Sequence, residues 1–133
     1  MPSPIRNIII DCADPFALAE FWSKVIDVPV SPESSPGGSE AFIDTPQGNP
    51  GLLFLRVPEN KVVKNRIHLD LTPEGASRDE ELRRLLGLGA TFLKDFRTED
   101  GGGWVTLADP EGNEFCLERD GDELSLAGEH QGE

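Results

Sequence analysis

The chain has 133 residues, enough for one domain or for two small units around a shared core, but too few for two domains of ordinary size. Hydrophobic residues make up 37%, and 14 glycines accompany them, which excludes wholesale disorder. Acidic residues outnumber basic ones by 25 to 12, and the net charge of −13 argues against a nucleic-acid or anionic-membrane partner.

Neither a membrane span nor a secretion signal is expected. The apolar run Ile8–Ile10 is interrupted by Asp11 and falls far short of the roughly 20 residues that a transmembrane helix needs. The N-terminal residues lack the apolar stretch of a signal peptide. Cys12 and Cys116 form neither a CxxC pair nor a disulfide framework, so both thiols are expected to be reduced. The chain is therefore expected to be cytoplasmic.

The first half predicts a strand, a helix and further short strands. Residues 5–12 form a β-branched run that is typical of a strand. Asp14 followed by proline indicates a helix start, and apolar residues at helical spacing extend the predicted helix over 15–27. Cys12 and Trp22 are expected in the core. After a loop rich in proline and glycine, strands are predicted near 41–44 and 51–57.

The second half repeats this order after a polar segment, 58–64, that is a candidate hinge. Residues 66–72 alternate between apolar and polar, as in a strand with one buried face. A helix is predicted over 78–88, where leucines recur on one side and glycine follows. Strands are then predicted at 91–95, 104–108 and 114–118.

These elements predict one domain over residues 1–120 that contains two modules of the same architecture, at about 5–57 and 66–119. The two halves share the order of their elements and little of their sequence. The acidic remainder, residues 121–133, is expected to fray.

Two stretches carry a family resemblance. They are VPENKVVKNRIHLDL at residues 57–71 and WVTLADPEGNEFC at residues 104–116, with DCADP at 11–15 and Phe21-Trp22 in support. With these motifs the chain resembles the glyoxalase-like, or vicinal-oxygen-chelate, superfamily over about residues 5–119, and within it the small bacterial glyoxalase-like branch. The resemblance implies an α+β fold of two βαβββ modules, whose curled sheets form a cup with the helices outside. Sheets of this size expose edges and a concave face, and such modules commonly pair, so we expect a homodimer.

Members of that superfamily usually hold a divalent metal in the cup, with ligands from the first and last strands of the modules. Carried onto this chain, the first-strand histidine falls on Asn7, the first module's last-strand ligand falls among the apolar residues 53–55, and the final glutamate falls on Cys116. Only His68 matches a ligand position. We therefore expect no tightly bound metal. The alternative is a divalent ion held by an unconventional set, namely His68, Glu114 and Glu118.

Alternation along three strands predicts which side chains line the cup. If Ile67 and its apolar neighbours pack under the helices, the residues between them face the hollow. The same count turns Phe115 and Leu117 away from it. The expected lining is polar and acidic, which favours a small-molecule site over a purely structural hollow. Besides Ile9 and Thr72, it consists of Asn7, Asp11, His68, Asp70, Glu114, Cys116 and Glu118.

Each candidate has a functional and a structural interpretation. His68 is either an acid–base group or a histidine held by hydrogen bonds. Asp70 either orients His68 or pairs with a neighbour from the basic cluster 61–66, which itself either binds a substrate carboxylate or forms ion pairs. Cys116 is either a nucleophile beside His68 or an inert buried thiol, which we favour. Trp104 follows three glycines that suggest a flexible lip, and it either closes over a bound ring or fills the sheet interface.

The leading functional hypothesis is a glyoxalase-like protein that binds a small molecule in a polar cup and works without a resident metal, as a lyase or isomerase with His68 as base. The first alternative is a divalent-metal-dependent lyase or dioxygenase. The second is a non-catalytic, drug-sequestering protein of the bleomycin-resistance kind, which the acidic cup favours loosely. The expected partners are a small-molecule ligand and a second copy of the chain, with no nucleic acid and no membrane.

Overall fold

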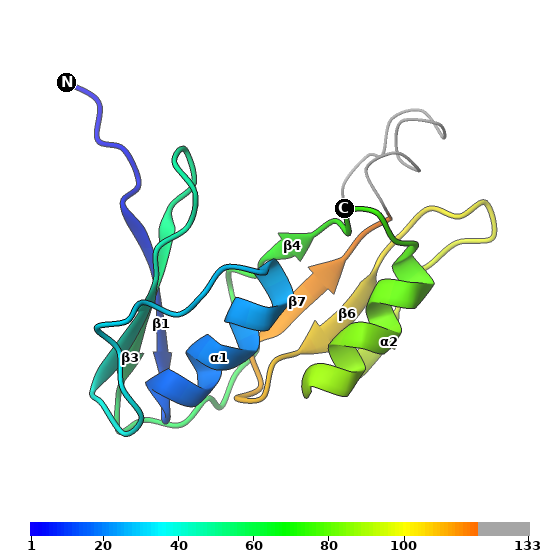
Figure 1. Cartoon of the computed structure of the whole chain (residues 1–133). Helices are drawn as coiled ribbons and strands as arrows, with labels where there is room; N and C mark the ends of the chain where they lie inside the picture. The colour runs from blue at the N-terminus through cyan, green and yellow to red at the C-terminus, as the bar shows by residue number, and fades with distance from the viewer. Residues whose placement is uncertain (120–133) are drawn as a thin grey trace. The chain divides into compact units, whose positions relative to one another are not determined.

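The computed structural model describes residues 1–119, and these divide into two compact units, of which the first is Met1–Val62 and the second begins at Val63 (Figure 1). Each unit contains one helix and one small curled sheet, so the predicted α+β class is confirmed. The joining of both sheets into one cup stays a prediction. No helix within residues 1–119 is both long and apolar enough to cross a bilayer.

In the first unit, β1 (Asn7–Cys12) is followed by α1 (Pro15–Ile26), and β2 (Glu40–Ile43) and β3 (Gly51–Arg56) complete the sheet. The strand order is β1-β3-β2, with β1 parallel to β3 and β2 antiparallel to it. An isolated bridge between Val30 and Ile43 lies beside β2. The predicted βαβββ order is therefore present, with its second strand reduced to that single bridge.

The bounds of α1 follow from its sequence. The Asp14 side chain accepts a hydrogen bond from a backbone N–H of the first turn at 3.2 Å, and Pro15 occupies the first helical position. The helix ends where Asp27 adopts a left-handed conformation with a φ of 58°. Trp22 and Cys12 are 2% and 3% exposed, so their predicted place in the core is confirmed.

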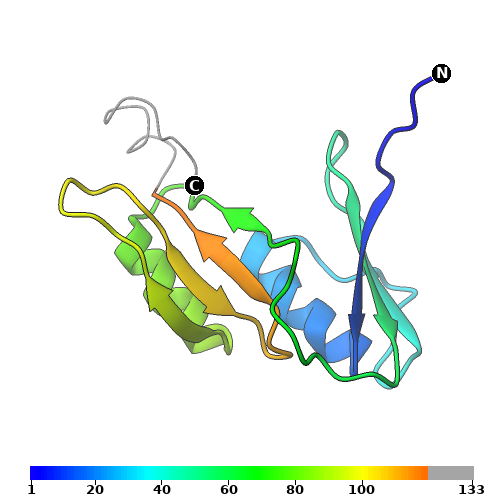
Figure 2. The same cartoon turned by 180° about the vertical axis from the view of Figure 1, so that it is seen from behind.

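The second unit contains the full βαβββ order, namely β4 (Asp70–Leu71), α2 (Arg78–Leu88), β5 (Thr91–Asp95), β6 (Val105–Ala108) and β7 (Glu114–Leu117). Its strand order is β4-β7-β6-β5, so the first strand again lies parallel beside the last. The opposite views of Figures 1 and 2 agree that α2 covers one face of this sheet. Ser77 and Glu80 form a capping box that begins α2.

Alternation along β6 and β7 separates a buried face from an open one. Four apolar residues are at most 1% exposed, namely Val105, Leu107, Phe115 and Leu117. Leu85 of α2 is fully buried as well. Thr106, Glu114 and Cys116 point to the other side of the strands and stay partly exposed. The side of the second sheet away from α2, called the open face below, therefore carries polar side chains.

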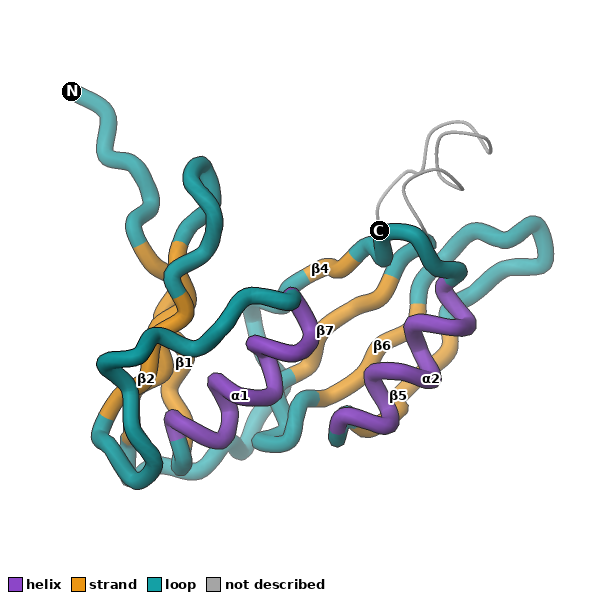
Figure 3. The backbone as a smooth tube through the Cα atoms, viewed as in Figure 1, coloured by secondary structure: helices purple, strands orange, loops and turns teal. Residues whose placement is uncertain are grey.

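The strand predicted over 66–72 is much shorter in the structure, as Figure 3 shows for β4. Only Asp70–Leu71 is strand, and Ile67 is 80% exposed, so the prediction that Ile67 packs under a helix is wrong. The register of Asp70 with Cys116 would place His68 opposite Glu114, so β7 does not itself end the pairing there. Instead, the backbone N–H of Asn65 donates to the Glu114 side chain at 2.9 Å, and the chain before β4 is irregular.

Candidate functional site on the open face of the second sheet

A row of polar side chains crosses the open face. The register pairs Cys116 of β7 with Asp70 of β4 on one side and with Thr106 of β6 on the other. Lys94 of β5 is the next partner of Thr106. Paired residues point to the same face of a sheet, and Thr106 Oγ1 lies 3.9 Å from Cys116 Sγ. The structure thus brings two predicted site residues, Asp70 and Cys116, into adjacent positions.

His68 lies beside this row, in the irregular chain before β4, with its side chain exposed. Its Nδ1 is 3.9 Å from Cys116 Sγ, and its Nε2 is 3.5 Å from Lys64 Nζ. A lysine ammonium can only donate hydrogen bonds, so Nε2 is the acceptor in this contact and Nδ1 carries the ring proton. The Nδ1 proton is then directed at sulfur. Cys116 is half-buried and beside His68, so the expectation that it is a buried thiol is wrong.

The two glutamates of the predicted lining differ in their surroundings. Glu114 Oε1 accepts a hydrogen bond from the backbone N–H of Asn65 at 2.9 Å, which fastens the chain before His68 to the start of β7. Glu118 is only 3% exposed, and its backbone N–H donates to the carbonyl of Leu71 at 2.7 Å. Glu118 therefore lies in the interior, whereas Glu114 positions the segment that carries His68.

Trp104 lies where the loop after β5 enters β6. Its ring stacks on Phe96, with 4.8 Å between ring centres and 21° between planes, and Lys94 Nζ lies 5.0 Å from the centre of the Phe96 ring. The carbonyls of Gly101–Gly103 accept hydrogen bonds of 2.9–3.2 Å from the buried guanidinium of Arg78. The three glycines, predicted as a flexible lip, are therefore fastened to the first turn of α2.

Asn7 and Asp11 belong to β1 and hence to the first unit. They lie four residues apart and share one face of that strand. Asn7 is half-buried against its register partner Gly51, where an added Cβ would lie 2.7 Å from Asn7 Oδ1. Asp11 is exposed. That both residues share a hollow with His68 stays a prediction.

The residues suggested for the alternative metal site do not fit a divalent ion. Within residues 1–119, no three His, Cys, Asp or Glu side chains are grouped to hold a metal. Of the suggested ligands, Glu114 accepts from the backbone of Asn65, and Glu118 is buried. The third, His68, has the Lys64 ammonium at Nε2, where a metal would meet a like charge.

Two of these contacts were not predicted from the sequence. Lys64 belongs to the predicted hinge 58–64 and His68 to the predicted strand 66–72, so no regular spacing related the two residues. Arg78 stands at the first position of a helix, where arginine is ordinarily exposed. Its burial depends on a loop whose first bonded carbonyl, that of Gly101, is 23 residues further along the chain. No periodicity in the sequence signals either contact.

Beside this loop, Arg97 forms ion pairs at 2.8 Å with Asp95 and with Asp79 of α2. Hydrogen bonds from the Arg97 side chain, and then from its backbone N–H, lower the pKa of Asp95 to about 2. Because the pKa is depressed in the folded state, the stabilisation is present above about pH 4 and is lost as the pH falls through about 2. We expect Arg97→Gln to move the NMR titration midpoint of the Asp95 carboxyl upward, and an unchanged midpoint would contradict the assignment.

Comparison with known proteins agrees with this architecture. A family model described as a glyoxalase-like domain matches residues 7–118. A glyoxalase/bleomycin resistance protein/dioxygenase family enzyme from Burkholderia phytofirmans PsJN is 20% identical with a TM-score of 0.67, over 87% of this chain and 98% of that one. None of the curated proteins searched matches the chain.

Two fosfomycin resistance proteins are also similar in structure. FosX from Listeria monocytogenes, solved with Mn(II) and 1S,2S-dihydroxypropylphosphonic acid, is 17% identical with a TM-score of 0.68, over 95% of this chain and 97% of that one. FosX from Mesorhizobium loti is 15% identical with a TM-score of 0.65, over 96% of this chain and all of that one. At these identities the likeness to solved structures concerns the fold alone. Because the family model spans nearly all of the described residues, the chain belongs to the glyoxalase-like domain family.

Proposed function

We propose that the chain binds a small carbonyl compound at the open face of its second unit and moves a proton with His68, as a lyase or isomerase without a resident metal. The observation that supports this proposal is the exposure of the His68 imidazole and the polar group beside each of its ring nitrogens. His68 is exposed, its Nε2 lies 3.5 Å from Lys64 Nζ, and its Nδ1 lies 3.9 Å from Cys116 Sγ. An accessible imidazole between two polar groups is suited to acid–base chemistry near neutral pH.

The two ring nitrogens have different roles in this proposal. A substrate carbonyl that displaces Lys64 from Nε2 exposes the lone pair on that nitrogen to the acidic C–H next to the carbonyl. His68 takes that proton, and the C–H electron pair moves onto the carbonyl oxygen as an enolate. The displaced Lys64 ammonium, still tethered nearby, then stabilises the enolate oxygen. The Nδ1–H stays directed at Cys116 and keeps the ring oriented.

Two alternatives are distinguished by what they bind. A divalent-metal enzyme is favoured by the FosX structure solved with Mn(II), but the donors around His68 in this chain disfavour it. A drug-sequestering binder is favoured by the net charge of −13, which attracts cationic ligands. The expected homodimer and the cytoplasmic location likewise stay predictions.

The test is a thermal-shift screen of uncharged carbonyl compounds against cationic aromatic compounds, with chain purified without chelator. We expect carbonyl compounds to raise the melting temperature. We expect NMR in D₂O to show deuterium wash-in next to the carbonyl of the best compound. His68→Asn should slow that exchange by about 10²-fold or more, as expected for loss of a general base.

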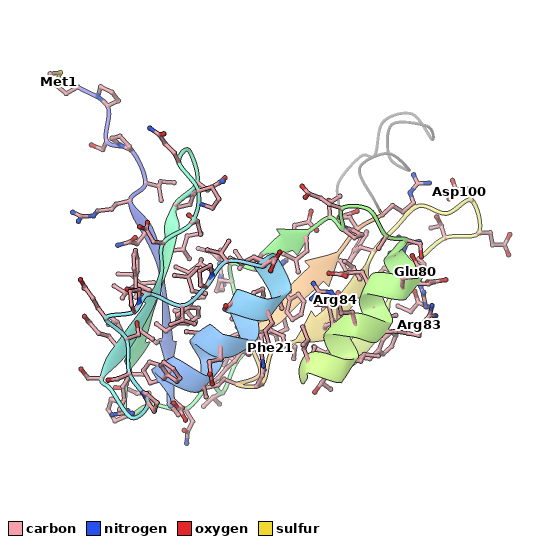
Figure 4. The ribbon with its side chains drawn as sticks, viewed as in Figure 1. Met1, Phe21, Glu80, Arg83, Arg84 and Asp100 are labelled. Carbon is pink, nitrogen blue, oxygen red and sulfur yellow. The ribbon has the colours of Figure 1, made fainter. Side chains whose placement is uncertain are left out.

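Arg83→Gln is the matched control, because Arg83 is exposed on α2 and therefore lies on the other side of the sheet (Figure 4). It should leave the wash-in unchanged. Shifts with cationic compounds alone would support the binder instead. A stoichiometric metal that is lost in His68→Asn would support the metal enzyme, and either result would contradict the proposed function.

A further inference from the structure

The two cysteines of the chain have opposite environments. Cys12 is 3% exposed, and its Sγ lies 3.5 Å from the carbonyl oxygen of Leu55 in the core of the first unit. Cys116 is half-buried on the open face, with His68 Nδ1 and Thr106 Oγ1 each 3.9 Å from its sulfur. Only the second thiol combines access from solvent with an acid–base group.

The contact of Lys64 with His68 decides which form of the thiol the site favours. Since Lys64 donates to Nε2, the other nitrogen is the N–H side of the ring and donates toward Cys116. A hydrogen bond donated to sulfur stabilises the thiolate more than the thiol, because the anion is the better acceptor. In this arrangement His68 stabilises the thiolate as a hydrogen-bond donor and does not take the thiol proton, which leaves to water.

We propose that Cys116 is a nucleophilic thiol that captures small uncharged electrophiles of the α,β-unsaturated carbonyl class. This inference goes beyond the proposed function and does not depend on it. Cys116 first loses its proton to water. The sulfur lone pair then forms an S–C bond at the β-carbon, the C=C electrons move onto the carbonyl oxygen as an enolate, and the α-carbon takes a proton from water. The net reaction adds S–H across C=C, with no oxidant and no leaving group.

The neighbours of Cys116 favour an uncharged electrophile. Asp70 is exposed and is the register partner of Cys116, so its carboxylate lies on the same face at the distance of a neighbouring strand. That charge repels an anionic reagent that approaches the sulfur, and it also disfavours the thiolate, so activation depends on the hydrogen bond from His68. Thr106, the register partner on the other side, adds no charge.

The experiment uses N-ethylmaleimide, an uncharged α,β-unsaturated imide, with peptide mass spectrometry to locate the adduct. At about pH 6.5 we expect adduct at Cys116 and none at Cys12, formed faster than with N-acetylcysteine. His68→Asn should slow the reaction at Cys116 by about tenfold, and the gap should close above about pH 9.5, where the thiol ionises without help. Lys64→Met should also slow the reaction at Cys116.

Arg83→Gln is the control and should react as the native chain does. Equal modification of Cys12 and Cys116, or a native rate no higher than that of N-acetylcysteine, would overturn the proposal. The proposal would also be overturned if Cys116 reacted at the same rate in His68→Asn as in the native chain at every pH. Circular dichroism of each variant excludes unfolding as the cause. Because this reactivity is read as a covalent adduct at Cys116 and not as a melting shift or deuterium exchange, it can fail while the ligand screen succeeds. The ligand screen can likewise fail while the adduct forms.

Discussion

Gly103→Ala is expected to lower the free energy of unfolding by about 4 kcal/mol, which is at the upper end for a single substitution. Gly103 has a φ of +71°, in the left-handed region that side chains strain. A Cβ at this position would lie 2.0 Å from the carbonyl oxygen of Phe96 and 2.9 Å from Cα of Arg97. Both are backbone atoms, so neither can rotate away.

The surroundings of Gly103 oppose any relaxation of the loop. Its carbonyl accepts a hydrogen bond from Arg78 Nη1 at 2.9 Å, and the next residue, Trp104, accepts from the Phe96 N–H at 2.9 Å. Moving Phe96 away from a new methyl group would lengthen its bond to Trp104 and part the stacked rings of these two residues. Moving Gly103 instead would lengthen its bond from Arg78. The cost of the clash is therefore added to the cost of the φ angle.

Urea denaturation of three glycine variants separates these two costs. Gly48 has a φ of +95° and nothing within 4 Å of an added Cβ, so Gly48→Ala should cost about 1 kcal/mol. Gly87 lies inside α2 with nothing within 4 Å, so Gly87→Ala should raise stability by up to about 1 kcal/mol. If Gly103→Ala costs no more than Gly48→Ala, the close approach to Phe96 does not constrain this loop.

Local signals predicted most of the fold. The helix expected over 15–27 is observed as Pro15–Ile26, and the one expected over 78–88 is observed as Arg78–Leu88. Both begin at side chains that cap their own first turn, which are interactions between near neighbours in sequence. The alternation of β7 was likewise predicted, and β7 pairs with β6 along its whole length and with β4 over its last two residues.

The candidate site could be predicted only in part. Alternation places Cys116 on the polar side of β7, but it gave the wrong conformation to the segment that carries His68. The backbone before β4 bonds at Asn65 to the Glu114 side chain, and regular pairing with β7 is limited to Asp70 and Leu71. The contact of Lys64 with His68 arises from that irregular chain, so it could not be predicted from a two-residue period.

The second large expected effect concerns the turn between β6 and β7, where Asp109→Ala should lower the free energy of unfolding by about 3 kcal/mol. Asp109 is 2% exposed, and its Oδ1 accepts from the backbone N–H groups of Glu111 and Asn113, both at 2.9 Å. The Asn113 side-chain amide donates to both carboxylate oxygens at 3.0 and 3.2 Å. Alanine would leave these partly buried donors without their charged acceptor.

The turn also sets the register that brings Thr106 opposite Cys116, so its loss should extend to the open face. In Asp109→Ala we expect faster hydrogen exchange at the amides of β6 and β7, because fewer bonds hold the two strands in register. Asp44→Ala is the matched control, since Asp44 is exposed, and its effect should stay within about 0.5 kcal/mol. Equal stability of the two variants in urea would show that the carboxylate of Asp109 does not hold the turn. A loss of stability without faster exchange in β7 would show instead that the turn is not what aligns Cys116 with Thr106.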